Sequence, residues 1–369
     1  MRARASEISR RFGRGALLPF QIGDDKLVFA PDGVDGVVVY GLAGRVAVVV
    51  GDPIGQTGDV WTAFDAFLEM CRRRRHAPTV YQASDEACDQ LARRGFRTIK
   101  VGREARVDLA AFDLAGPRRA NLRHTVSRAR RGGVSVSVHL AGLPKAEHER
   151  LKHGLKAIDD AWRAHAGPEL GFTVGRFDPS ELGAVCIAIA QQEDGTPVAF
   201  ATFRPTGTDG GWVLDLMRRL PGGTPGAFEL CLAEAASAMR AAGASGLSLG
   251  LVPLSGLSSS SSILEERLLA RGSQAVRPWY DTVGLEFFKQ KFDPTWEARY
   301  IAVRGRDDLL RLAIALLRLH LGGFRRAART ALTGTVGRRV VRPDSHPRRV
   351  TVRSVSPGHE PDQSMSEVP

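Results

Sequence analysis

The sequence has few cysteines, and none of them has a partner at metal-binding or redox spacing. The four cysteines are Cys71, Cys88, Cys186 and Cys231. None lies in a C-x-x-C motif or has a histidine at the spacing of metal ligands. This scarcity predicts neither a disulfide framework nor a metal site, and it is typical of a protein in a reducing cytoplasm.

Long hydrophobic runs are also missing. The longest apolar stretch, Leu309–Leu321, is interrupted by Arg311, Arg318 and His320, and it is shorter than the ~20 apolar residues that a membrane-spanning helix needs. The N-terminus carries arginines but no apolar stretch of the kind found in signal peptides. We therefore predict a cytoplasmic protein that does not cross a bilayer but that lies peripherally on the inner face of the plasma membrane.

Three signatures of catalytic or nucleotide-binding loops are absent. No G-x-G-x-x-G motif follows a predicted strand, and no G-x-x-x-x-G-K-[ST] motif occurs, so a dinucleotide site and a P-loop have no support. A G-x-S-x-G elbow is missing as well, because the one match to that pattern, Gly246–Gly250, coincides with the predicted strand at 247–251 and not with a strand-to-helix turn. This argues against a serine nucleophile of the α/β-hydrolase type. The chemistry must therefore come from residues without such a signature.

Positive charge, in contrast, is abundant and unevenly placed. The chain has a net charge of +12. Three segments, residues 1–14, 118–131 and 325–353, carry net charges of +4, +6 and +8, and the rest of the chain is net −6. Such patches suit a polyanion, namely tRNA, another nucleic acid or an anionic membrane surface. An arginine-rich composition is the simpler alternative, because only seven of the 52 basic residues are lysine.

Hydrophobic periodicity predicts an α/β (α+β) fold with two similar lobes. Val37–Tyr40 and Arg45–Val50 form a predicted hairpin, and a helix that Asp59 caps follows it. This hairpin–helix–strand order returns after residue 134, which is typical of tandem acyltransferase-like (GNAT-like) lobes with mixed sheets. The predicted division is a basic N-terminal arm (1–20), a first lobe (21–116), a basic connecting helix (117–133), a second, catalytic lobe (134–304), an amphipathic helix (305–330) and a disordered basic tail (331–369).

Two clusters of charged residues stand at the ends of predicted strands. Lys100 and Glu104 flank Arg103 at a spacing that allows an ion pair, which is either functional or a surface pair. Asp215 lies in an apolar strand, where a buried carboxylate must pair or serve a site. Arg218 follows it next to a Gly-rich loop that either binds an anion at the next helix or simply turns the chain.

Two further clusters lie later in the chain. Ser255 stands in the loop after the strand at 247–251, where α/β proteins often bind ligands, although a serine that stabilises the loop is the simpler alternative. Lys289 and Lys291 alternate with phenylalanines, a pattern that suits phosphate and stacking contacts. The same pattern also suits a helix with a buried aromatic face and solvated lysines.

Seven short motifs, taken together and in order, resemble one known family. They are Gly51-Asp52-Pro53-Ile54-Gly55, Lys100-Val101-Gly102-Arg103-Glu104-Ala105, Asp108-Leu109, Gly175-Arg176-Phe177, Asp215-Leu216-Met217-Arg218, Leu249-Gly250 with Pro253-Leu254-Ser255-Gly256, and Phe288-Lys289-Gln290-Lys291-Phe292 with Pro294-Thr295-Trp296-Glu297. From about Gly36 to Val303 the chain is similar to the C-terminal catalytic domain of bacterial phosphatidylglycerol lysyl/alanyltransferases.

The resemblance implies a tandem GNAT-type fold that takes an aminoacyl group from aminoacyl-tRNA and moves it to a lipid hydroxyl. Aminoacyl-tRNA is then a co-substrate, and no cofactor, metal or DNA is implied. The functional positions of the family map onto a short list, with Lys100, Glu104, Asp215 and Arg218 as catalytic residues and Ser255, Lys289 and Lys291 as substrate-binding residues. Asp215 would hold the amino group or take a proton, and Arg218 would bind a phosphate or the oxyanion.

Two departures from the family pattern affect this interpretation. Arg103 precedes Glu104 where family members often have a pair of acidic residues, which bears on the amino acid carried. The chain also shows no counterpart of the multi-span flippase domain that precedes the catalytic domain in lysyltransferases. The amino acid transferred and the oligomeric state stay open.

The same resemblance implies binding partners for the basic segments. We expect the tRNA backbone to contact the helix at 118–131 through its six arginines, Arg118, Arg119, Arg123, Arg128, Arg130 and Arg131. The amphipathic helix at 307–326 either meets anionic lipid or packs on the second lobe.

Three rival functions remain at this point. The first is a soluble aminoacyl-tRNA-dependent transferase with a small-molecule amine or hydroxyl acceptor. The second is an acetyl-CoA-dependent acetyltransferase, because Arg219–Thr224 loosely follows the R-x-x-G-x-G/A pyrophosphate loop except at its last position. The third is a nucleic-acid-binding protein on an inactive transferase scaffold.

Overall fold

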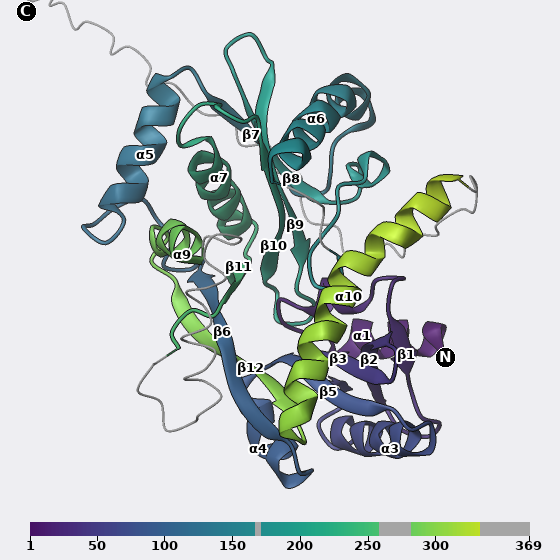
Figure 1. The fold of residues 1–369 in the computed structure, drawn as a ribbon. Coiled ribbons are helices and arrows are strands. Elements are labelled where there is room, and N and C mark those ends of the chain that lie inside the picture. The colour runs from purple at the N-terminus through teal and green to yellow at the C-terminus, as the bar shows by residue number, and fades with distance from the viewer. Residues whose placement is uncertain (167–170, 258–281, 333–369) are drawn as a thin grey trace, which may run out of the picture.

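The two halves of the chain contribute to one continuous mixed sheet (Figure 1). The computed structural model describes the backbone of residues 1–166, 171–257 and 282–332. The N-terminal half contains α1 (Arg2–Phe12), α2 (Leu18–Gln21), β1 (Leu27–Phe29), β2 (Gly36–Ala43), β3 (Val46–Val50), β4 (Ile54–Gly55), α3 (Val60–Arg73), β5 (Ala77–Ala83), α4 (Asp85–Arg93) and β6 (Arg97–Asp108). The C-terminal half contains α5 (Ala120–Arg131), β7 (Ser135–His139), α6 (Lys145–Ala166), η1 (Pro179–Glu181), β8 (Cys186–Gln191), β9 (Pro197–Pro205), β10 (Trp212–Arg219), α7 (Ala227–Ala241), β11 (Gly246–Pro253), α9 (Thr282–Gln290), β12 (Thr295–Val303) and α10 (Arg306–Leu332).

The sheet order shows how the halves are joined. Its strands run β1-β2-β3-β5-β12-β6-β11-β10-β9-β8-β7, with β4 paired to β2. β6 pairs with β11 and so connects the halves, while β12, from late in the chain, lies between β5 and β6. The predicted hairpin at 37–50 is confirmed as the antiparallel pair β2–β3.

Helices cover both faces of the sheet. In the N-terminal half, α3 buries Phe64, Phe67 and Cys71 against one face. In the C-terminal half, α7 and α5 cover one face and α6 the other (Figure 1). Strands β2, β3 and β8 are buried along nearly their whole length, and their sequences are accordingly apolar nearly throughout.

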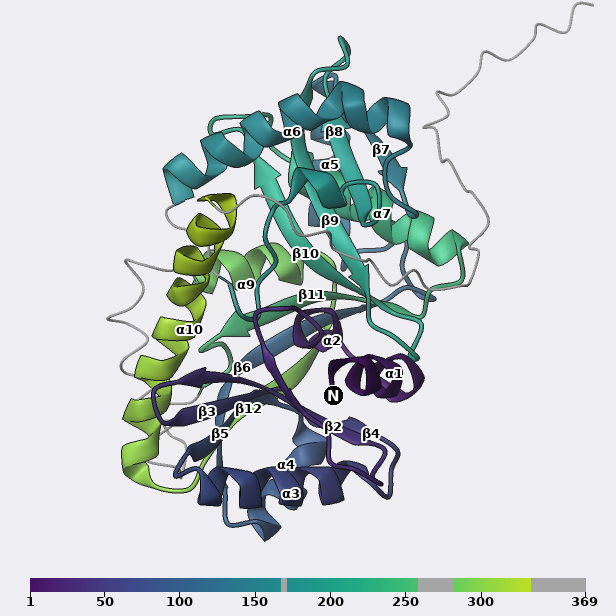
Figure 2. The ribbon, with the colours of Figure 1, turned by 90° about the vertical axis from the view of Figure 1, so that its right-hand side faces the viewer.

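The amphipathic helix α10 packs on the N-terminal half. Leu312 and Ala315 are buried against the face opposite α3, and the helix contacts β2, β3, β5 and β12. It runs along the outside of the sheet (Figure 2). The alternative that this helix packs on the second lobe is therefore wrong, because its main contacts are with β2 and β3 of the N-terminal half.

The N-terminal segment is a helix docked on the sheet. Ile8 of α1 is only 2% exposed and packs with Val37 and Val39 of β2. Arg4 and Arg11 approach the carboxylate of Asp35 at 4.0 and 3.6 Å. Acidic neighbours thus offset part of the positive charge of the predicted basic arm.

One predicted cap is wrong in its detail. The helix α3 does begin after Asp59, but the Asp59 carboxylate makes no capping bond and accepts a hydrogen bond from the Asp35 amide at 3.0 Å. The next helix, α4, has a side-chain cap at its N-terminus, because Ser84 Oγ accepts a hydrogen bond from the Ala87 amide at 3.2 Å. The Asp59 carboxylate ties two loops together instead.

The strand register shifts at several points of the sheet, and two of these shifts lie on β10 and β11. The register of β10 against β9 shifts between Leu214 and Leu216, and that of β11 against β6 shifts between Ser248 and Leu251. The parallel pairing of β10 with β11 is confined to Trp212–Leu247 and Val213–Ser248. Bulges re-aim side chains and are common next to active sites.

Candidate functional site

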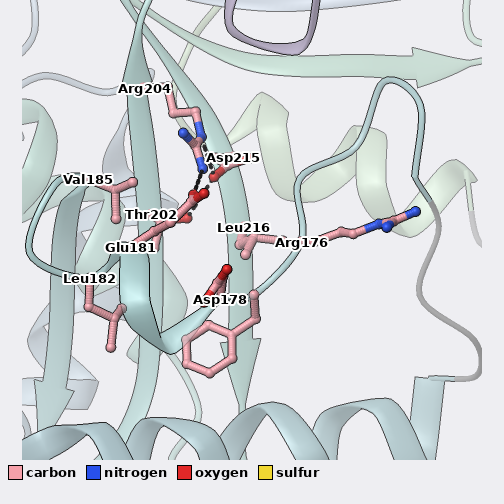
Figure 3. Close-up of a pocket in the computed structure, with 10 residues that line it drawn as sticks. Arg176, Asp178, Glu181, Leu182, Val185, Thr202, Arg204, Asp215 and Leu216 are labelled. Carbon is pink, nitrogen blue, oxygen red and sulfur yellow. Dashed lines mark hydrogen bonds and ion pairs between the residues drawn. The ribbon is translucent and has the colours of Figure 1, made fainter. Parts of the chain in front are cut away.

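A small pocket opens where the β10 bulge meets the loop that precedes β8 (Figure 3). Its walls come from β9, β10, η1 and the chain on either side of η1. The lining residues are Arg176, Phe177, Asp178, Glu181, Leu182, Val185, Thr202, Arg204, Asp215 and Leu216. The bulge lets Asp215 and Leu216, which are consecutive, both line this pocket.

Asp215 is the buried acid of the pocket. Its side chain is 2% exposed. Oδ2 accepts a hydrogen bond from Arg204 Nε at 2.9 Å and one from Thr202 Oγ1 at 3.3 Å. Oδ1 is also buried but has no hydrogen-bond partner among the described residues. Burial raises the pKa of this carboxyl, and the nearby Arg204 opposes that rise.

The neighbours of Asp215 fix its position. Arg204 also donates to Glu181 Oε2 at 2.7 Å, so one guanidinium holds two carboxylates (Figure 3). Gly175 lies directly against Asp215, and a Cβ at that position would overlap Oδ1. The unsatisfied oxygen therefore lies directly against a glycine, which leaves room for it because glycine has no side chain.

The pocket pairs Asp215 with Arg204, whereas Arg218 has another partner. Arg218 Nε donates to Asp159 Oδ1 of α6 at 2.8 Å, and both side chains are nearly buried. Arg218 is not among the described residues that line the pocket. Arg204 was not predicted from the sequence, although, like Asp215, it is a charged residue in an otherwise apolar strand.

A second polar cluster surrounds Glu104 on β6. The Glu104 side chain is 5% exposed. Its Oε2 accepts from Arg299 Nε at 2.8 Å, and its Oε1 accepts from Ser248 Oγ at 2.6 Å. Arg299 and Ser248 were not predicted, because the strands that carry them are distant in sequence. Lys100, four residues before Glu104, is half-buried and lies opposite Tyr300 of β12.

Lys289 lies beside this second cluster, buried at the β11 bulge. Its Nζ donates to the carbonyl oxygens of Gly250 and Leu251 at 2.9 and 3.1 Å. Burial lowers the pKa of Lys289 to about 7, and the Glu104 carboxylate opposes that shift. The bulge thus supplies the acceptors that hold an ammonium group inside the fold.

Ser255 is hydrogen-bonded to both Arg103 and Glu286. Its hydroxyl donates to Glu286 Oε2 at 2.8 Å and accepts from Arg103 Nε at 3.2 Å. The Arg103 guanidinium lies 4.9 Å from the centre of the Trp296 ring. This arginine, which departs from the family pattern, therefore joins β6, the loop after β11, α9 and β12.

Lys291 is engaged with an acid of α7. Its Nζ lies 2.7 Å from Glu229 Oε1 and within 6.0 Å of the centres of the Phe287 and Phe288 rings. The structure brings together Glu104 and Lys289, and it gives Ser255 and Lys291 separate acidic partners.

The basic helix α5 has one buried and one exposed face. Leu122 and Val126 are buried in the core that α7 shares. Arg119 is only 12% exposed and donates to the carbonyl of Ala111 at 3.0 Å, which makes it a loop-fixing residue. The other predicted tRNA contacts are exposed, and they are Arg118, Arg123, Arg128, Arg130 and Arg131.

Three of the exposed arginines have intramolecular partners. Arg123 donates to the carbonyl of Leu114 at 2.7 Å, Arg130 pairs with Glu234 at 2.5 Å, and Arg118 lies 3.9 Å from the Asp293 carboxylate. The cationic surface of α5 is therefore carried mainly by Arg128 and Arg131.

The described ranges contain neither a cluster of metal ligands nor a membrane-spanning helix. No group of three or more His, Cys, Asp or Glu residues there is placed to hold a metal ion. No helix in the same ranges is long and apolar enough to span a membrane.

Comparison with known proteins places this geometry in context. A family model described as phosphatidylglycerol lysyltransferase, C-terminal, matches residues 19–303. A phosphatidylglycerol lysyltransferase from Bacillus subtilis is 30% identical over 289 residues, which are 78% of this chain and 33% of that protein. The chain thus spans about a third of the length of this curated relative.

Two solved structures share the fold. The C-terminal DUF2156 domain of a protein assigned as a lysylphosphatidylglycerol synthetase from Agrobacterium fabrum is 29% identical, with a TM-score of 0.74 over 87% of this chain and 97% of that one. L-PGS from Bacillus licheniformis is 27% identical, with a TM-score of 0.74 over 86% of this chain and 96% of that one.

Proposed function

Because the chain belongs to the family of C-terminal domains of phosphatidylglycerol lysyltransferases, we propose that it transfers an aminoacyl group from aminoacyl-tRNA to a hydroxyl of phosphatidylglycerol. The observation that carries this proposal is Asp215, a buried carboxylate with one unsatisfied oxygen in a pocket. A carboxylate whose pKa is raised by burial, as that of Asp215 is, is a better proton acceptor than an exposed one.

The chemistry needs few groups, since the ester of aminoacyl-tRNA is already activated. The lipid hydroxyl attacks the ester carbonyl, a new ester forms, and the ribose hydroxyl of the tRNA leaves with a proton. Holding the hydroxyl against the carbonyl supplies much of the rate. We assign Asp215 as the acceptor of the hydroxyl proton and Arg204 as the group that keeps Asp215 ionised and oriented.

The other candidate residues have supporting roles in this proposal. Arg218 orients the β10 edge through Asp159 and lies outside the pocket. Glu104 and Lys289 keep the β11 bulge in place, and with it the polar loop that holds Ser255. The exposed arginines of α5 contact the tRNA backbone without reading its sequence.

The test is transfer of radiolabel from a panel of charged tRNAs into chloroform-soluble and aqueous products. We expect label in the organic phase with at least one tRNA, and a loss of about 100-fold or more in Asp215→Asn. The matched control is Asp89→Asn, which changes an exposed acid of α4. Absence of organic-phase label with every tRNA refutes the lipid acceptor, and label in an aqueous product alone favours a small-molecule acceptor.

A further inference from the structure

The helix α10 has an apolar face that nothing in the described structure covers. Leu310, Ile314, Leu317 and Leu321 are 68%, 44%, 61% and 40% exposed. Their spacing of four, three and four residues places them in one line along the helix. The opposite side, with Leu312 and Ala315, is the side that packs on the sheet. The helix is therefore apolar on two faces, of which only one is used by the fold.

Positive charge accompanies this exposed line. At 3.6 residues per turn, Arg311 and Arg318 fall along one edge of it, and both are exposed. Arg311 has one acidic neighbour, Asp308, at 3.3 Å. From Leu309 to Leu332 the sequence has five arginines and no acidic residue. A helix with an aliphatic face and a cationic border is typical of peripheral binding to anionic bilayers.

One short loop connects this face to the Asp215 pocket. The Gly171 amide donates to the carbonyl of His320 at 3.0 Å, and Thr173 Oγ1 lies 3.3 Å from His320 Nε2. Val174, the next residue, is 42% exposed. Gly175 then lies against Asp215, so the chain passes from α10 to the pocket within a few residues.

We propose that Leu310, Ile314, Leu317 and Leu321 form a surface that docks in the interface of an anionic lipid bilayer. This set is called the α10 stripe below. Docking places the Asp215 pocket at the membrane surface, where loop 171–178 leads a lipid head group to it. The inference rests on the proposed function, because only a lipid acceptor remains in a bilayer.

Charge favours a bilayer over a second copy of the chain. Two copies that met through the α10 stripe would bring their arginines together, and the acids of α10 are confined to its first turn, at Asp307 and Asp308. An anionic membrane surface instead attracts each of those arginines. The stripe is also aliphatic throughout and has no aromatic anchor of the kind that dominates protein interfaces.

Flotation with vesicles tests the docking surface directly. We expect the protein to bind vesicles that contain phosphatidylglycerol and to bind pure phosphatidylcholine vesicles much less. The double variant Leu310→Ser/Leu317→Ser should lower the partition coefficient by about tenfold or more, because it removes two aliphatic side chains from the interface. The matched control is Val283→Ser, which changes a 54% exposed residue of α9, away from α10.

A transfer assay with two acceptors separates docking from catalysis. With vesicle phosphatidylglycerol, the double variant should lose activity in proportion to its binding. With short-chain phosphatidylglycerol below its micelle concentration, it should match the wild type, which also shows that it is folded. Equal losses with both acceptors, or vesicle binding equal to that of the wild type, would overturn the proposal.

Two more outcomes are informative. A wild type that binds vesicles through the α10 stripe but transfers label to neither acceptor supports docking and refutes the proposed function. A wild type that is dimeric, ignores vesicles and becomes monomeric in the double variant overturns docking and assigns the stripe to a second copy of the chain.

Discussion

Replacement of Lys289 by methionine should change the stability of the protein in a way that depends on pH. Lys289 is 3% exposed, and burial lowers its pKa to about 7. In the unfolded chain a lysine titrates near pH ~10.4. Between these two values the unfolded state binds one more proton than the folded state, so the free energy of unfolding rises with pH over this window. As the pH falls, this gain in the free energy of unfolding is lost, and the loss is complete just below pH 7.

The magnitude follows from the same two pKa values. Linkage gives a contribution of Lys289 to the free energy of unfolding that is about 2 kcal/mol more favourable at pH 9 than at pH 7. Lys289→Met also leaves the carbonyls of Gly250 and Leu251 without their donor, but this cost does not depend on pH. The difference in unfolding free energy between wild type and variant should therefore grow by about 2 kcal/mol in favour of the wild type from pH 7 to pH 9.

Urea denaturation of both proteins at the two pH values measures this change. The comparison cancels the titrations that the two proteins share. Lys156→Met is the matched control, because it removes an ammonium group from the exposed surface of α6. A difference between wild type and Lys289→Met that stays constant to within about 0.5 kcal/mol would refute the assignment of a desolvated ammonium to this bulge.

Three further predictions follow from the contacts described above. Gly175→Ala should lower transfer activity by about tenfold or more, because the new Cβ displaces the Asp215 carboxylate. Its control is Gly183→Ala, where the nearest atom, the carbonyl oxygen of Leu143, is 3.7 Å from the new Cβ, and equal activity of the two variants would refute the close packing. Asp159→Ala should lower the free energy of unfolding in urea by about 3 kcal/mol, because it leaves the guanidinium of Arg218 buried without its acid; Asp160→Ala, on the exposed side of the same helix, should cost less than about 1 kcal/mol, and similar costs at the two positions would contradict the buried pair. Arg128→Ala/Arg131→Ala should weaken tRNA binding and lower its salt dependence in filter binding without a change in melting temperature. Arg119→Ala should instead lower the melting temperature, because Arg119 donates to the carbonyls of the 111–113 loop. A tRNA affinity that is unchanged in the double variant would refute the proposed interface.

Much of the fold could be predicted from local sequence patterns. The β-branched runs at 37–50 indicated a hairpin, and the spacing of Phe64, Phe67 and Cys71 indicated the buried face of α3. The mixed α/β class and the resemblance are confirmed by the match at 19–303 and by the two solved structures. These features depend on neighbouring residues, or on motifs that keep their order along the chain.

The partners in the site could not be predicted, because they depend on register between strands. Arg204 and Asp215 meet where the register of β10 against β9 shifts between Leu214 and Leu216. Glu104 and Arg299 are 195 positions apart and are paired by the insertion of β12 beside β6. A period-two pattern gives the face of a side chain but does not reveal which strand lies next to it.

The position of β12 has a consequence for the order in which the protein can fold. β12 lies between β5 and β6 of the N-terminal half, yet it is separated from β6 by nearly 190 residues. During synthesis, the edges of β5 and β6 that pair with β12 therefore stay unpaired until residue 303 has left the ribosome. Open edges of this kind invite pairing with other chains, and contacts this distant in sequence slow folding. Nascent chains of this protein are thus expected to need protection late in translation, and a chain that ends before residue 295 should aggregate rather than yield a separable N-terminal domain.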